Sequence, residues 1–322
     1  MNWNSLLQSI VIGLASGSLI ALIALGYTLV YGIVELINFA HGEIFMMGAF
    51  CTITVVSATG VTPESTWPAI VGVAVLALFV ASIFSAGLNF GIDRIAYRRL
   101  RKAPRLAPLI AAIGFSFILQ NIGIYWHGSN TTTPPPLIPQ KYRAYNVLRE
   151  WFNWDTTVRV RPIDLMVVGI TIPLLIGLSW FVYRTRTGKA MRATAQDRDA
   201  AALMGIDVNR TIAIAFLLGG ALAGAAGMIT LYYNNSARYQ MGFRYGLFAF
   251  TAAVLGGIGN MTGAVVGGLI IGLVWALSDG FMKSVVDGWG AQWTPSVIFA
   301  VLVIVMIFRP SGLFGDHAPE KV

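Results

Sequence analysis

The sequence predicts an all-α, polytopic membrane protein with about eight or nine transmembrane helices, some of them discontinuous. Two observations lead to this class. Of the 322 residues, 56% are hydrophobic and only 11% are charged, whereas roughly 25% are charged in an average soluble domain. The apolar residues also gather in runs of on the order of 20, the length that a helix needs to span a hydrocarbon core of about 30 Å. We expect one transmembrane domain over residues 1–322.

The apolar runs define the expected crossings. The run from Pro68 to about Ile92 is the clearest, because it contains no ionisable side chain. The other long runs are Ser5–Tyr31, Ala107–Trp126, Ile163–Tyr183, Thr211–Tyr233, Thr262–Met282 and Ala291–Phe308. Two shorter stretches, Glu43–Thr59 and Tyr245–Ile258, are either full crossings or broken ones. The count therefore depends on these two stretches.

Basic residues form two clusters, six between Arg94 and Arg105 and six between Arg184 and Arg210. With a net charge of +8, such clusters could indicate nucleic-acid binding. Both lie directly beside apolar runs, however, which is the pattern of cytoplasmic loops. We therefore expect membrane topology, and no nucleic-acid partner, to explain them.

The topology follows from placing both clusters inside. Two crossings separate them, so residues 127–162 form an external loop, which Pro134–Pro136 make irregular. After Arg210, four crossings return the chain to an internal tail at Arg309–Val322. The N-terminus lies outside if Glu43–Thr59 is a full crossing and inside if that stretch is re-entrant.

Glycine is frequent, with 35 residues. Many of them form Gly-x-x-x-Gly pairs, among them Gly13/Gly17, Gly220/Gly224, Gly263/Gly267 and Gly268/Gly272. This spacing puts both glycines on one helix face, where a neighbouring backbone can approach closely. The pairs predict tight helix packing, and dimerisation through one of these faces stays open.

The segment Glu35–Glu43 interrupts the apolar pattern with three ionisable groups. A charge at the centre of a membrane helix costs about 2.5 to 3.5 kcal/mol on insertion scales, so such groups usually face a cavity or a polar partner. Gly42 is the expected break, because discontinuous helices line cavities in transporters. His41 and Glu43 would lie on different faces of a continuous helix. A short solvated loop is the alternative, and a metal site is disfavoured because these side chains lack a ligand-spaced partner.

Two further features also interrupt the apolar runs. A related glycine-rich break is expected at Val254–Ala264, and such a pair of breaks indicates a pathway built on internal repeats. Asp164 and Asp279 fall near the outer ends of predicted crossings, where each caps a helix or meets water.

The cytoplasmic loop 184–210 contains a predicted helix. Its alanines, with Met191, Leu203 and Met204, favour a helix, and Gly205 is a natural stop. Such a helix presents a small, partly apolar surface to another protein. The alternative is an ordinary amphipathic surface helix.

At these two segments the chain resembles the permease subunits of bacterial ATP-binding-cassette importers for branched-chain amino acids. Gly26–Val34 together with Ile37–Glu43 looks like a hallmark of that family. Asp199–Gly205 is similar to the Glu-Ala-Ala-x-x-x-Gly signature by which importer permeases dock on their ATPases, with Asp in place of Glu and no later Leu-Pro. Phe248–Gly259 also matches, and the resemblance covers nearly the whole chain.

The resemblance implies a division of labour. An external, periplasmic solute-binding protein captures the solute, this chain and a second related permease form the pathway, and two cytosolic ATP-binding subunits supply the energy. The chain would then be a non-catalytic, multi-pass subunit in the lipid of the bacterial inner (cytoplasmic) membrane, with no catalytic residue, cofactor or metal. Residues 1–322 would form a single importer transmembrane domain.

The resemblance also assigns residues. The translocation pathway would involve Asn38, His41, Gly42 and Glu43, which line the route or hold its broken helix. Coupling to the ATPase, within the loop 184–210, would involve Asp199, Ala200, Ala201 and Gly205. Among the coupling residues, the alanines and the glycine would pack closely against the ATPase, and the aspartate would make a polar contact or cap the helix.

Other functions remain open from the sequence. Permeases of urea and short-chain amide importers share this type, so the cargo is either a branched-chain or other hydrophobic amino acid or one of these amides. A secondary transporter driven by an ion gradient would use Glu35, His41 or Glu43 as proton-linked groups. A membrane-embedded enzyme would use His41 and Glu43 as its reactive pair. No phosphate-binding Gly-x-x-x-x-Gly-Lys-Ser/Thr loop occurs, so ATP hydrolysis is expected elsewhere.

Overall fold

The protein is all-α. The computed structural model describes residues 3–36, 38–101, 103–104, 106–137, 146–152, 158–286 and 288–315. Within these ranges every named element is helical, and β-structure is limited to an isolated bridge between Thr132 and Ala237. Parts of some predicted segments lie outside the described residues. These parts are Ile37, Lys102, Arg105, 138–145, 153–157 and 316–322.

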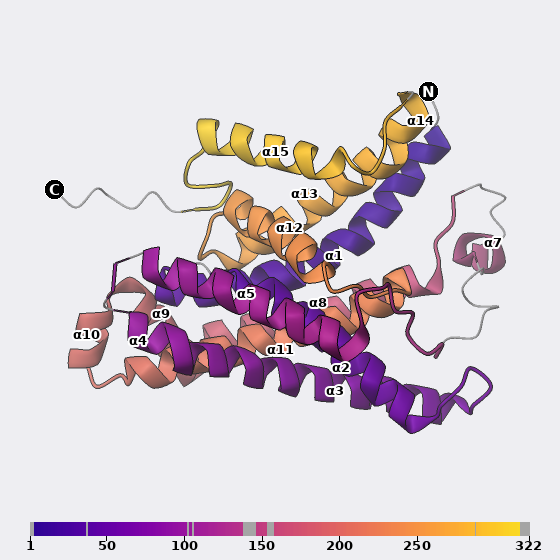
Figure 1. The fold of residues 1–322 in the computed structure, drawn as a ribbon. Coiled ribbons are helices and arrows are strands. Elements are labelled where there is room, and N and C mark those ends of the chain that lie inside the picture. The colour runs from indigo at the N-terminus through magenta and orange to yellow at the C-terminus, as the bar shows by residue number, and fades with distance from the viewer. Residues whose placement is uncertain are drawn as a thin grey trace.

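Nine apolar helices build the described bundle (Figure 1). They are α1 (Trp3–Val34), α2 (Ala40–Thr59), α3 (Trp67–Ile92), α5 (Leu106–His127), α8 (Pro162–Arg184), α11 (Val208–Asn234), α12 (Met241–Gly256), α13 (Met261–Ala276) and α15 (Thr294–Phe308). The shorter elements are the π-helical turns η1 (Asp93–Tyr97) and η2 (Leu277–Met282), with α4 (Arg98–Leu100), α7 (Val147–Phe152), α9 (Arg186–Gln196), α10 (Arg198–Leu203) and α14 (Lys283–Val285).

The helix lengths confirm the predicted polytopic class. Seven helical stretches are long and apolar enough to cross a membrane, and α12 and α15 are shorter apolar helices. The stretch left open at Glu43–Thr59 belongs to α2, which is helical over 20 residues and has spanning length. Three such helices therefore precede the basic cluster that begins at Arg94.

The two ends of the bundle differ in charge. Arg101 from the first basic cluster donates a hydrogen bond to Asn209 beside the second, with Nη1 and Oδ1 2.6 Å apart. Figure 1 shows α4, α9 and α10 together at one end, whereas the start of α1 and the short helix α7 lie toward the other. The positive-inside rule predicts that the end with the basic clusters is cytoplasmic, and the start of α1 would then lie outside.

The chain contains two copies of one element order. The series α1, α2, α3, η1, α4, α5 corresponds to α11, α12, α13, η2, α14, α15. In each copy the long first helix is followed by a residue with positive φ, Glu35 at 53° and Asn235 at 54°, and the third helix passes directly into a π-helical turn. The counterpart of the Glu35–Glu43 break is therefore the junction at 235–240. The glycine-rich turn predicted at Val254–Ala264 is present as the α12–α13 connection, but it corresponds to the α2–α3 connection in the repeat, so its predicted equivalence to the first break is wrong.

The packing follows the same repeat. Helix α1 packs along α13 as α11 packs along α3, and α2 packs on α12 at the centre. The first helices run in opposite directions, since α1 starts at the outer end and α11 at the basic end (Figure 1). The two copies thus form an inverted repeat, the architecture in which transporters place a solute pathway at the repeat interface.

The four Gly-x-x-x-Gly pairs named from the sequence lie at contacts inside the chain. Gly13/Gly17 and Gly268/Gly272 are at the contact between α1 and α13, Gly220/Gly224 face α3, and Gly263/Gly267 face α12. The predicted tight packing is confirmed. Dimerisation through these faces is excluded, because the helices of the same chain already cover them.

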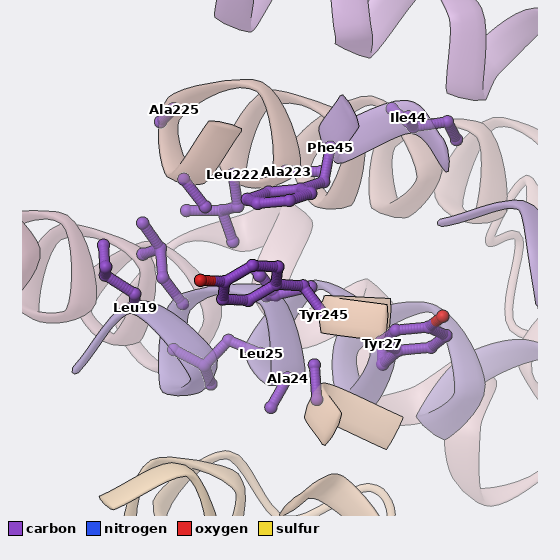
Figure 2. Packing of buried hydrophobic residues seen from close by; sticks show 14 of the residues in the cluster. Leu19, Ala24, Leu25, Tyr27, Ile44, Phe45, Leu222, Ala223, Ala225 and Tyr245 are labelled. Atoms are coloured by element: carbon purple, nitrogen blue, oxygen red, sulfur yellow. The ribbon is translucent and has the colours of Figure 1, made fainter. Parts of the chain in front are cut away.

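The core lies where the two repeats meet. Figure 2 shows Phe45 of α2 facing Tyr245 of α12, between Leu25 of α1 and Ala223 of α11. The two ring centroids are 5.4 Å apart, and Phe45 is completely buried. Lipid is as apolar as these side chains, so close packing holds the helices together here.

Candidate functional site

The helix break lies between α1 and α2. Helix α1 ends at Val34, Glu35 has a φ of 53°, and the chain becomes helical again at Ala40. The break therefore lies between Val34 and Ala40, and the prediction that it falls at Gly42 is wrong. Gly42 belongs to the first turn of α2.

Asn38 ties this junction to two other helices. Its Nδ2 donates to Asn89 Oδ1 of α3 at 3.1 Å, and Asn89 Nδ2 donates to the carbonyl oxygen of Phe216 in α11 at 2.7 Å. Asn38 and Asn89 are both buried. The two amides thus join the junction, α3 and α11 in one hydrogen-bonded chain.

Gly42 allows α2 to approach α12 very closely. A Cβ at this position would collide with the carbonyl oxygen of Gly242 and the Cα of Gly246. The absence of a side chain is therefore required by the contact between the two helices at the repeat interface. This requirement explains the glycine better than the backbone break expected from the sequence.

His41 and Glu43 point to different neighbours, as their spacing predicts. The imidazole of His41 lies edge-on to Tyr27 of α1, with ring centroids 4.6 Å apart, and against the Cα of Gly26. Both His41 and Glu43 are buried. Among the described residues no group of three His, Cys, Asp or Glu is arranged to hold a metal ion.

Glu43 connects α2 to α5. Its Oε1 accepts hydrogen bonds from Gln120 Nε2 at 2.8 Å and from Ser116 Oγ at 3.2 Å. Its Oε2 lies beside Gly242 at the start of α12. A single buried carboxylate therefore contacts both α5 and α12.

A cavity of about 1040 Å³ lies between α5 and α12. Its polar lining includes Ser116 and Gln120 of α5, and Arg238 and Arg244 around the start of α12. None of the four pathway residues predicted from the sequence lines this cavity directly. Ser116 and Gln120, which the sequence reasoning missed, separate Glu43 from it. Their four-residue spacing in an apolar run was a usable signal, because it puts both polar groups on one helix face.

Asp164 and Asp279, the two further acids singled out from the sequence, both accept hydrogen bonds from side chains of the chain. Asp164 caps α8 by accepting a hydrogen bond from the backbone N–H of Arg161 at 2.8 Å, and it forms an ion pair with that side chain. The hydrogen bond from Arg161 to Asp164 also raises the pKa of the guanidinium. Asp279 of η2 instead accepts hydrogen bonds from Trp275 Nε1 and Thr294 Oγ1.

The predicted coupling segment forms two helices, α9 and α10. Asp197 caps α10, because its Oδ1 accepts from the backbone N–H groups of Asp199 at 2.9 Å and Ala200 at 3.0 Å. The cap is thus Asp197, so the capping role suggested for Asp199 is wrong. Gly205 has a φ of +83°, which a glycine adopts without strain, and it ends the helix.

The exposed surface of α10 differs from the one expected. Ala201 is only 4% exposed and packs inside the chain, whereas Asp199, Ala200 and Gly205 are exposed. The large apolar side chains Leu203 and Met204 are 89% and 83% exposed. Arg198, at the start of α10, donates to the carbonyl oxygen of Ile33 in the last turn of α1, with Nη2 and the oxygen 3.1 Å apart.

The inverted repeat, the buried polar junction and the cavity beside it define the class of this protein, a polytopic membrane transport protein. The sequence profile described as "Branched-chain amino acid transport system / permease component" matches residues 9–307. The chain belongs to this family.

Individual relatives agree with the family assignment. The chain is 39% identical to the high-affinity branched-chain amino acid transport system permease protein BraD of Pseudomonas aeruginosa, over 98% of each chain. It is 36% identical to the corresponding permease protein LivH of Escherichia coli K12, over 98% of this chain and 97% of LivH. A probable branched-chain amino acid transport permease protein of Methanocaldococcus jannaschii is 28% identical over 92% of this chain and 89% of that protein.

Proposed function

We propose that the chain is the membrane-spanning permease subunit of an ATP-driven importer for branched-chain or other hydrophobic amino acids. The similarity to BraD and LivH over 98% of this chain carries the proposal, since both belong by name to high-affinity branched-chain amino acid transport systems. Residues 1–322 act as one importer transmembrane domain in the bacterial inner membrane. Residues 127–162 form its external loop and residues 184–210 its cytoplasmic coupling loop.

The cavity between α5 and α12 is this chain's part of the pathway. Asn234, which ends α11 at the outer end of the bundle, contributes to its lining. The cavity therefore belongs to the outer half of the molecule, where an external solute-binding protein delivers cargo. A second related permease covers its open side.

The predicted pathway residues position the cavity walls. Asn38 anchors the junction to α3, Gly42 admits the close approach of α12, and Glu43 connects α12 with α5. His41 packs against α1. A shift of this junction would move both cavity walls together, because they are joined through the same carboxylate.

The coupling function is assigned to α10. Leu203 and Met204 present an apolar surface beyond the basic end of the bundle, which suits insertion into a cleft of a cytosolic ATP-binding subunit. Arg198 connects this helix to Ile33, two residues before the Glu35 break. Displacement of α10 by ATP-driven closure would therefore reach the junction and, through Glu43, the cavity.

ATP hydrolysis is assigned to two separate cytosolic subunits, and this chain performs no covalent chemistry. The lipid-facing surface is supported by exposed apolar side chains on the outer helices, including Phe79 of α3, Phe117 of α5 and Ile176 of α8. These side chains contact membrane lipid or the second permease.

Uptake of labelled solutes tests the proposed cargo. The chain is purified with its partner permease, its ATP-binding subunits and its solute-binding protein, and reconstituted in vesicles with ATP on the cytoplasmic side. We expect ATP-dependent accumulation of leucine that unlabelled isoleucine and valine compete away. Accumulation of urea or a short amide, with no accumulation of leucine, would contradict the proposal.

A further inference from the structure

Arg244 lines the α5–α12 cavity and packs against two aromatic rings, those of Trp275 and Phe248. Its guanidinium carbon is 5.6 Å from the ring centroid of Trp275 and 5.7 Å from that of Phe248. Both distances are within the range of cation–π contacts. Arg244 is exposed, so its N–H groups are accessible from the cavity while its guanidinium rests against the two rings.

Asp279, which hydrogen-bonds to Trp275 beneath Arg244, forms no ion pair with this arginine. Asp279 accepts hydrogen bonds from Trp275 and Thr294. No ion pair of Arg244 or Arg238 is formed within the described ranges. The aspartate thus orients the indole on which Arg244 rests and leaves the guanidinium charge for another partner.

The cavity as a whole is positive. Arg238 and Arg244 line it, and none of its described lining residues is acidic. The buried carboxylate of Glu43 lies beside Gly242 at the N-terminus of α12 and offsets the dipole of that helix, so the positive charge of the lining comes from the two arginines. An anionic group is the natural occupant of such a site, and a carboxylate can accept two parallel N–H bonds from arginine.

The rest of the lining suits an apolar body. Phe39, Ile113 and Leu247 contribute hydrophobic surface to the cavity. The amide nitrogen of Gln120 donates a hydrogen bond to Glu43. The side-chain oxygen of Gln120 is therefore left as an acceptor for an ammonium group. The cavity therefore combines a fixed cation, an apolar wall and an amide acceptor.

We infer that this cavity is a cargo-binding subsite in which Arg244 binds the free carboxylate of an apolar amino acid. The inference rests on the proposed function and specifies how the pathway selects its cargo. Arg238 adds to the positive field, and the hydrophobic lining takes the cargo side chain. Neutral amides lack the carboxylate and bind poorly.

Protection of an introduced thiol tests this subsite in the assembled transporter. The change Ser236→Cys adds a reactive thiol to the cavity lining, in a Cys51→Ala background that removes the buried native cysteine. We expect leucine to slow alkylation of this thiol and leucinamide, which has the same shape without a carboxylate, to leave the rate unchanged. Equal protection by both compounds, or no protection by leucine, would overturn the inference.

Variants of the arginines sharpen the test. Arg244→Gln should raise the half-protecting leucine concentration at least about tenfold, because the charge-assisted hydrogen bonds from the guanidinium to the carboxylate are lost. Arg244→Lys should retain part of the protection, and the exposed Arg149→Gln of α7 should retain all of it. Protection that survives Arg244→Gln unchanged would contradict the assignment.

Leucine uptake in the same preparation separates the two proposals. Normal ATP-driven uptake without thiol protection would refute the subsite and leave the proposed function standing. Thiol protection without ATP-driven uptake would refute the proposed function.

Discussion

The carboxylate of Glu43 on α2 accepts a hydrogen bond from the amide of Gln120 on α5, with Oε1 and Nε2 2.8 Å apart. Gln120 lines the cavity, whereas Glu43 is fully buried behind it and touches Gly242 of α12. This pair joins the broken-helix junction to both cavity walls. Changes at the junction should therefore affect the pathway through packing.

The first prediction concerns this carboxylate. Glu43→Leu should destabilise the protein by about 1 to 3 kcal/mol, because it leaves the Gln120 and Ser116 donors without their acceptor. Glu43→Gln retains an acceptor oxygen and should cost less. Thermal unfolding of the purified complex measures both. The exposed Glu64→Leu serves as the control, and an equal loss for Glu43→Leu and Glu64→Leu would contradict the role of Glu43.

The second prediction concerns the approach of α2 to α12. Gly42→Ala introduces a Cβ against the backbone at Gly242 and Gly246, so we expect a loss of about 1 to 3 kcal/mol, the usual cost of overpacking. Gly114→Ala on α5 adds the same atom in open space and should be neutral or slightly stabilising. The yield of monodisperse complex after heating compares the two. Similar yields would show that the close approach is not required.

The third prediction concerns the ion pair between Arg101 and Asp93 beside the first basic cluster. Arg101 Nη2 and Asp93 Oδ1 are 2.7 Å apart, with side chains 11% and 2% exposed. Arg101→Gln should lower stability by about 3 to 5 kcal/mol, because it leaves a buried carboxylate without its partner.

A second substitution checks that mechanism. Adding Asp93→Asn to Arg101→Gln should restore part of the lost stability, whereas the exposed Arg99→Gln should change it little. Strictly additive losses for Asp93→Asn and Arg101→Gln in chemical denaturation would contradict the pairing.

The fourth prediction concerns α10. Replacing both Leu203 and Met204 by Ser should leave the melting temperature nearly unchanged, because exposed substitutions usually fall within about 0.5 kcal/mol. ATP-driven uptake should fall at least tenfold. This decrease corresponds to the loss of about 1.4 kcal/mol or more of interaction free energy with the ATP-binding subunit. The exposed Ala202→Ser on the same helix should keep normal uptake. Normal coupled uptake by the double variant would reject this docking surface.

The spanning helices could be predicted closely from the sequence. The run from Pro68 to about Ile92 corresponds to α3 at Trp67–Ile92, and Thr211–Tyr233 to α11 at Val208–Asn234. A long apolar run is a local property, and the bilayer imposes its minimum length. The length of such a helix therefore needs no knowledge of its neighbours.

The details of the site depended on the tertiary structure. From the sequence alone, Gly42 suggests a helix break. In the structure, a glycine is required at this position because the backbone of α12, about 200 residues later in the chain, lies against it. Likewise, the inward orientation of Ala201 and the exposure of Leu203 depend on how α10 packs on the bundle. The sequence predicts an internal repeat but puts its second break at Val254–Ala264, because the helix order and the positive φ of Glu35 and Asn235 that locate it are properties of the folded chain.

The source of energy tests the central claim most directly. Leucine uptake is measured in vesicles that contain the chain with its partner subunits, once with ATP at the cytoplasmic face and no ion gradient, and once with a proton gradient and no ATP. We predict accumulation only with ATP, and none in vesicles that contain this chain alone. Accumulation by this chain alone under a proton gradient would contradict the account and identify a secondary transporter.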